Sequence, residues 1–218
     1  MRVLITAGPT YEPLDPVRFI GNHSTGKMGY ALAETFAAEG AEVLLISGPT
    51  NLPDPSNARI QTVRVQTAQE MYEAAVVEAA AADVWVFAAA VADYRPAQVA
   101  EQKIKKAGET LTLELVKNVD IAAELGKTKR PEQFSVGFAL ETENEHAHAL
   151  GKLQRKNFDM VVLNSLRDAG AGFRHDTNKV TLLDADGRIT TFELKAKTDV
   201  ARDIVRSVLA RRLPQPHA

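Results

Sequence analysis

The chain contains no cysteine. Disulfide bonds and thiolate zinc sites are therefore excluded, and the composition is compatible with a reducing compartment. No apolar run reaches the roughly 20 residues that a membrane-spanning helix needs. The net charge is only −2, so the chain lacks the basic excess typical of nucleic-acid binding. The first residues form no signal-peptide pattern, and we expect a cytoplasmic protein with neither membrane nor nucleic acid as partner.

The hydrophobic and charged fractions, 45% and 25% of 218 residues, are those of an ordinary globular protein. We expect one domain over residues 1–212 and a disordered tail over residues 213–218. Short apolar segments alternate with helical patterns along the chain. The predicted strands are 2–7, 42–46, 60–65, 84–90, 134–138 and 160–163, and the predicted helices are 25–39, 68–81, 143–155 and 197–212. This alternation predicts an α/β fold with a doubly wound, Rossmann-like, mostly parallel sheet.

Two segments interrupt the alternation with the period-two pattern of β-strands. Residues 103–106 and 110–115 flank a turn at 107–109. Residues 180–183 and 189–194 flank an Asp-Gly turn, which is a strong hairpin signal. We expect each segment to form an inserted β-hairpin arm.

A polar, glycine-containing segment, residues 21–29, opens the first predicted helix. Its small residues Ser24, Gly26 and Gly29 would let an anion approach backbone N–H groups that have no partner at a helix start. The helix dipole adds about half a positive charge there, so the segment predicts a phosphate or carboxylate site. Residues 91–96 follow the fourth predicted strand. In a doubly wound sheet both segments border the crevice at the switch point, where we expect the ligand.

Two common nucleotide motifs fit this segment only in part. Residues 21–27 match most of the P-loop pattern, but Met28 stands where a hydroxyl should reach magnesium. Gly26 and Gly29 supply part of the dinucleotide fingerprint, but residues 46–49 hold no acid for a ribose. The remaining alternatives are an NAD(P)-linked reductase with a degenerate glycine turn and a nucleotide-sensing module without turnover.

Several polar residues have a structural explanation beside a functional one. The lysines at 103, 105 and 106 are typical of a solvated strand edge, and Lys152 and Lys156 share one helix face. As functional groups, these cations suit a polyphosphate. Asp120 is typical of a helix cap. Asn22 is either a turn residue or an oxyanion donor, and Asp93 is either a cap or an acceptor for a nucleobase amino group.

Short blocks of a known pattern occur in order along most of the chain. They are residues 5–10, 12–13, 15–18, 22–29, 46–50, 88–94, 103–106, 117–120, 136–142, 152–156 and 173–178. Among them are Asn-His-Ser-Thr-Gly-Lys-Met-Gly, Ala-Ala-Ala-Val-Ala-Asp-Tyr and Lys-Ile-Lys-Lys. The ordered series resembles the phosphopantothenoylcysteine synthetase family, in its bacterial, CTP-dependent type.

The resemblance implies a ligase of coenzyme A biosynthesis that joins 4′-phosphopantothenate to L-cysteine. CTP, with Mg²⁺, would convert the carboxylate to an acyl-cytidylate and release pyrophosphate, and the cysteine amine would then displace CMP. The resemblance also implies a homodimer. Members often carry a fused flavin-dependent phosphopantothenoylcysteine decarboxylase, so association with one is implied, and no flavin is expected in this chain.

The resemblance assigns catalytic roles to Asn22, which would handle the acyl-cytidylate, and to Lys103. The other nucleotide contacts that it implies are Gly8, Ser24, Gly26, Gly29, Asp93, Val116, Lys117, Asn118, Val119, Phe138, Lys152 and Lys156. Arg18 would reach the phosphopantothenate phosphate across a dimer interface, because its planar fork binds phosphate at two points. Ala89 and Ala90, with Asn22, would contact the substrate. His23 and Val119 depart from the family pattern, which has arginine and proline there.

Overall fold

The computed structural model describes residues 1–106, 108–141, 143–165 and 176–212. Its strands are β1 (Arg2–Ala7), β2 (Tyr11–Asp15), β3 (Arg18–Gly21), β4 (Glu42–Ser47), β5 (Ile60–Arg64), β6 (Val84–Phe87), β7 (Tyr94–Pro96), β8 (Leu115–Lys117), β9 (Phe134–Glu141), β10 (Met160–Ser165), β11 (Thr177–Asn178), β12 (Val180–Asp184), β13 (Ile189–Thr191) and β14 (Lys195–Ala196). Its helices are α1 (Lys27–Ala38), α2 (Ala68–Ala79), α3 (Ile121–Gly126), α4 (Glu145–Arg155) and α5 (Lys197–Arg212). Within this part of the chain no helix is long and apolar enough to cross a membrane.

The central sheet confirms the predicted doubly wound fold. In the described residues it has eight strands in the order β13-β12-β10-β9-β6-β1-β4-β5. Within this sheet the neighbouring strands β10, β9, β6, β1, β4 and β5 run parallel. At the other edge, β12 and β13 are antiparallel. The parallel strands follow the Rossmann order, so the chain reverses direction across the sheet between β1 and β6. This is the predicted switch point.

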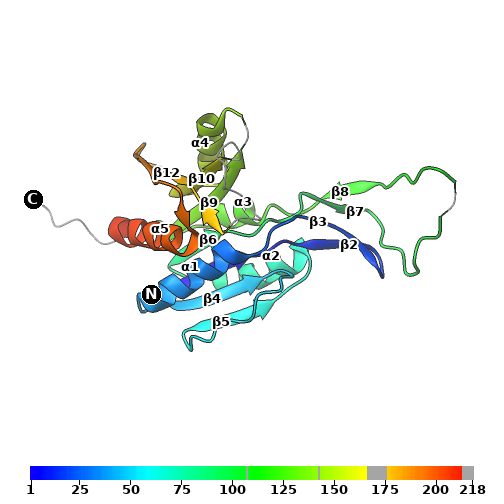
Figure 1. The fold of residues 1–218 in the computed structure, drawn as a ribbon, viewed down its shortest axis with the longest axis horizontal. Coiled ribbons are helices and arrows are strands. Elements are labelled where there is room, and N and C mark those ends of the chain that lie inside the picture. Colours follow the sequence, from blue (N-terminus) through cyan, green and yellow to red (C-terminus); the bar gives the residue numbers. More distant parts are fainter. Residues whose placement is uncertain (107, 142, 166–175, 213–218) are drawn as a thin grey trace, which may run out of the picture.

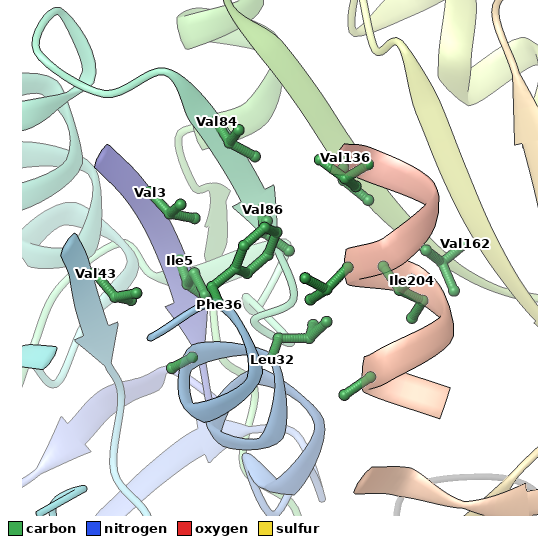
Figure 2. Packing of buried hydrophobic residues seen from close by; sticks show 14 of the residues in the cluster. Val3, Ile5, Leu32, Phe36, Val43, Val84, Val86, Val136, Val162 and Ile204 are labelled. Carbon is green, nitrogen blue, oxygen red and sulfur yellow. The ribbon is translucent and has the colours of Figure 1, made fainter. Parts of the chain in front are cut away.

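Both faces of the sheet are buried, and alternate residues of each strand point to opposite layers. Val3 and Ile5 of β1 pack with Leu32 and Phe36 of α1 in a cluster that α5 completes (Figure 2). Leu4, between them, packs in a second cluster with α2 and α3. A third cluster lies under α4. Because a parallel strand contacts helices on both sides, its sequence is apolar throughout, which is why these strands could be predicted.

An arm projects from one side of the sheet (Figure 1). We use "the arm" for the β2–β3 hairpin together with the described residues from 94 to 117. The β7 and β8 strands pair at its base, antiparallel, with Arg95 opposite Val116. Leu14 of β2 accepts a hydrogen bond of 2.9 Å from the Ala100 N–H, which ties the hairpin to the longer segment.

The arm corrects two predictions. The hairpin between 103–106 and 110–115 is wrong: among the described residues these segments form no strand before Leu115, where β8 begins and pairs with β7. Their alternating apolar residues, such as Leu111 and Leu113, are exposed, and a period-two pattern stabilises a strand only when one face is buried. The β2–β3 hairpin was not predicted, because two prolines and a polar composition made its segment read as a loop.

Other boundaries shift by a few residues. The predicted strand 84–90 ends at Phe87, α1 begins at Lys27 and α4 at Glu145, and β9 continues to Glu141. The second hairpin arm is confirmed as β12 and β13, although β13 ends at Thr191. The predicted tail over 213–218 and residues 173–175 of the last sequence block lie outside the described residues. The single domain over 1–212 stays a prediction.

Candidate functional site

A cleft of about 780 Å³ lies at the carboxyl ends of β1 and β6. It is bordered by the start of α1, by the chain after β6, and by the segment between β8 and α3. Phe138 of β9 closes one side, with Lys152 of α4 and Lys156, which directly follows α4. The two polar segments that follow the first and fourth parallel strands therefore meet in one crevice, as their positions in the sequence predicted.

The start of α1 is open toward an anion. Gly26 precedes the helix with φ of 79°, and no side chain caps the first turn. No acidic residue lies in that turn. Gly29 packs against β1 so closely that an added Cβ would lie 2.5 Å from the Ala7 Cβ. The helix N-terminus therefore reaches the strand end only because residue 29 has no side chain.

Gly8 supports this turn from behind. It does not line the cleft, but its Cα lies 3.5 Å from the position of a Cβ added to Gly26. Its φ is 76°, a conformation that favours glycine. Ser24 lines the cleft, and its Oγ accepts a hydrogen bond of 3.3 Å from the Gly26 N–H.

Asn22 joins the end of β3 to the chain that follows β6. Its Nδ2 donates to the carbonyl oxygens of Ala90, at 3.0 Å, and Val91, at 3.3 Å. The Ala90 N–H in turn donates to the Gly8 carbonyl at 2.8 Å. These contacts orient the Asn22 amide beside Ala89 and Ala90 on the cleft wall. The amide nitrogen is already bonded, so a role as oxyanion donor requires the exchange of one of these bonds.

Asp93 and Asn118 face the same part of the cleft. The Asn118 N–H donates to the Asp93 carbonyl at 2.9 Å, and its Nδ2 donates to the Ala92 carbonyl at 2.8 Å. Asn118 thus holds residues 117–119 against the chain after β6. Asp93 is exposed, and it also lines a neighbouring hollow that holds His148 and Arg155.

The two lysines at the C-terminal end of α4 are held by hydrogen bonds. Lys152 Nζ donates to the Phe138 carbonyl, and Lys156 Nζ bonds the Asp120 carboxylate at 2.9 Å. Burial alone would raise the pKa of Asp120, but its bonds with Lys156 and with the Ala123 N–H, and the charge of Lys152, lower it. Asp120 therefore stays anionic while it caps α3, as predicted, and keeps the Lys156 ammonium at the cleft.

Three predicted site residues lie outside the cleft, on the arm. Lys103 is exposed and Val116 is half-buried in β8. Arg18 bonds the Asp15 carboxylate and donates to the Ile104 carbonyl at 2.9 Å. The Asp15 side chain is fully buried, and its bond with Arg18 holds the pKa of that carboxyl well below the ordinary value, although burial raises it.

The cleft also contains residues that the sequence patterns missed. Lys27, Asn164, Asn178 and Lys197 line the side nearest α1 and α5. Lys27 lies within the predicted segment 21–29, although no site role was assigned to it, so its position was a usable signal. Lys197 is the first residue of the last helix and resembles any solvated helix start, and nothing in its spacing points to the cleft.

The described residues contain no group of three or more His, Cys, Asp or Glu side chains arranged to hold a metal ion. Asp93 and Asp120 both line the cleft. Mg²⁺ usually binds proteins through one or two carboxylates while it keeps several waters and substrate phosphates. Asp120 already bonds Lys156 and the Ala123 N–H, so a magnesium ion in this cleft would be held mainly by the phosphates of a nucleotide.

Comparisons with known proteins agree with the fold. The family model "DNA/pantothenate metabolism flavoprotein C-terminal domain" matches residues 1–211. A protein of an unknown prokaryotic organism, named cysteine/cysteine sulfinic acid decarboxylase, is 52% identical over 95% of this chain and 58% of its own length. The coenzyme A biosynthesis bifunctional protein CoaBC of Haemophilus influenzae is 46% identical over 97% of this chain and 52% of its own.

A solved structure agrees as well. The crystal structure of the C-terminal domain of coenzyme A biosynthesis bifunctional protein CoaBC superimposes with a TM-score of 0.81 at 42% identity. It covers 96% of this chain and 94% of that one. The chain thus spans about half the length of the curated relatives that it matches, and it corresponds to nearly all of this solved domain.

Proposed function

The chain belongs to the DNA/pantothenate metabolism flavoprotein C-terminal domain family, and we propose that it is a ligase that joins 4′-phosphopantothenate to L-cysteine with CTP. The observation that carries the proposal is the cleft at the switch point. There the uncapped start of α1, the Asn22 amide and the α4 lysines face one space. An anion-binding helix start beside a polar wall suits a reaction between a carboxylate and a nucleoside triphosphate.

The reaction has two steps, because a carboxylate has no good leaving group. A carboxylate oxygen of phosphopantothenate attacks the α-phosphorus of CTP, the bond to the β-phosphate oxygen breaks, and pyrophosphate leaves. The cysteine amine then attacks the acyl carbon and loses a proton, and CMP leaves with the electrons of the acyl–oxygen bond. Holding both substrates in one cleft supplies the proximity that these steps need.

The side chains suggest a division of tasks. The N–H groups at the start of α1 would bind phosphate oxygens, and Lys152 and Lys156 would neutralise charge on the nucleotide. Asp93 would accept a hydrogen bond from the cytosine amino group. Asn22 would position the acyl-cytidylate between Ala90 and the attacking amine. Mg²⁺, carried by the triphosphate, would offset negative charge at the transferring phosphorus.

The arm supports a homodimer. It exposes large apolar side chains, among them Val17, Phe19, Val99, Leu111 and Leu113, which are between 38% and 61% accessible. Exposed apolar side chains gathered on one projection are typical of an interface. We propose that a second copy of this chain covers them, and that Arg18 and Lys103 act in the partner's cleft from there. A decarboxylase partner is proposed from the bifunctional name of the relatives.

The test is pyrophosphate release by the purified chain with CTP and phosphopantothenate, first without cysteine and then with it. We expect about one pyrophosphate per site without cysteine, followed by steady turnover when cysteine is added. Turnover with ATP but not CTP would keep the ligase and refute the nucleotide. CTP binding without any release would refute the ligase and favour a nucleotide-sensing module. Carbon dioxide from cysteine, with no pyrophosphate, would favour the decarboxylase name of one relative.

A further inference from the structure

The last helix begins inside the cleft with a buried lysine. Lys197 is 8% exposed and lines the side of the cleft nearest α1. A short ladder places it there: β14, directly before it, pairs with β11, and the Lys197 N–H donates to the Asp176 carbonyl at 2.9 Å. Lysine is rarely this buried unless its ammonium group is paired with a negative charge.

Lys197 lies beside a second ammonium group, that of Lys27. Burial lowers the pKa of Lys197, the positive charge of Lys27 lowers it further, and Asp176 raises it. The Asp176 carboxylate also bonds Lys27 Nζ at 2.5 Å. Both lysines line the cleft beside the start of α1, where the helix dipole adds about half a positive charge. These groups together favour an anion at this end of the cleft.

A second, independent observation comes from Asn178, which is 2% exposed and lines the same side of the cleft. Its Nδ2 donates to Asn164 Oδ1 at 3.2 Å, while its own Oδ1 has no hydrogen-bond partner. A buried acceptor without a donor is costly. This end of the cleft therefore contains a polar atom that the described fold leaves without a partner.

The cleft has two different ends. Asp93, Asp120, Lys152 and Lys156 also line the neighbouring hollow, whereas Lys27, Asn178 and Lys197 do not. Lysines lie at both ends, but the end that holds Asp93 also offers an acceptor suited to a base, and the other end offers the uncapped start of α1. With Asp93 on the base, as proposed above, the phosphates extend toward α1 and α5.

We propose that Lys197, with Lys27, binds the terminal phosphates of the nucleotide, the part that leaves as pyrophosphate. The inference rests on the proposed function for the identity of the nucleotide. It assigns to the start of α5 a share of the phosphate binding that was expected from the first-helix segment and from lysines elsewhere in the chain. Lys197 contacts the leaving group and not the base or the ribose.

The test compares three ligands by titration calorimetry: inorganic pyrophosphate, CTP and CMP. Lys197→Met should weaken pyrophosphate and CTP binding by about tenfold or more, the loss expected for one charge-assisted hydrogen bond. CMP binding should change by less than about twofold, because CMP has no terminal phosphates. Lys127→Met, which removes an exposed lysine directly after α3, is the matched control and should change none of the three.

Stability separates a binding role from a structural one. Thermal unfolding without ligand shows whether the Lys197→Met protein is folded before its affinities are compared. If the folded variant loses affinity for all three ligands equally, the inference is wrong. Lys27→Met, at a more exposed position, tests the same site should Lys197→Met not fold, and it should spare CMP binding. Pyrophosphate binding without ligase turnover would refute the proposed function alone, and unchanged pyrophosphate binding would refute this inference alone.

Discussion

Replacing Gly29 by alanine tests how closely the first helix must approach the first strand. The added Cβ would lie 2.5 Å from the Ala7 Cβ and 3.2 Å from the Ala7 Cα. Carbon atoms in ordinary contact are about 3.5–4.0 Å apart, so the overlap is about 1–1.5 Å. Ala7 is fully buried at the end of β1, and α1 is the element that must move.

The cost can be worked out from two opposing terms. Overpacking of this kind costs about 1–3 kcal/mol, and alanine in place of glycine within a helix returns about 0.5–1 kcal/mol. The net loss reaches about 2 kcal/mol, which lowers Tm by up to about 8 °C in a protein of this size. A shift of the helix start by about 1 Å should also slow pyrophosphate release by about a hundredfold.

The assay pairs thermal unfolding with pyrophosphate release. Gly151→Ala is the matched control, because that glycine also lies within a helix and an added Cβ would approach only the flexible end of Arg155, at 3.2 Å. The control should be stabilised by about 0.5–1 kcal/mol. Ala7→Gly, which removes the opposing Cβ, should recover part of the loss in a double variant. A Gly29→Ala protein as stable and as active as the parent would refute the close approach.

Three further outcomes are expected. Asn22→Asp cannot donate to the Ala90 carbonyl and adds negative charge, so amide formation should fall by about a hundredfold or more while the pyrophosphate burst persists; normal turnover in rapid-quench assays would remove Asn22 from the second step. Lys103→Gln should raise KM for CTP by about fivefold or more without a change in Tm, and an unchanged KM would return Lys103 to a solvated-edge role. The folded pKa of Asp15 is lowered, so this carboxylate stabilises the fold fully above its unfolded pKa, near 3.8, and the stabilisation is lost as pH falls toward the folded pKa. Asp15→Asn should therefore flatten the acid side of the stability profile, measured by urea unfolding between about pH 2 and 6. An unaltered profile would contradict the Arg18 bond.

The amino-acid sequence determined the sheet and one half of the cleft. The sequences of β1, β4, β6, β9 and β10 are apolar because each strand is covered on both faces. An apolar run therefore indicates a buried strand without knowledge of what covers it. Residues 21–29 and 91–96 were found because a helix start and a strand end have local signatures. Parallel strands then carried both segments to one edge, as the doubly wound topology requires.

The tertiary structure alone decided the arm and the other half of the cleft. The alternating residues 110–115 lack a partner layer, and β8 instead pairs with β7, which only the path of the chain could settle. Lys197 lies near Lys27 because α1 and α5 pack together, although the two lysines are 170 residues apart in the sequence. Asp15 likewise accepts a hydrogen bond from Ile104, which lies in a distant part of the chain. Local sequence patterns indicate which residues a segment buries and how its ends are capped. They do not indicate which charged residue from a distant part of the chain will lie beside it.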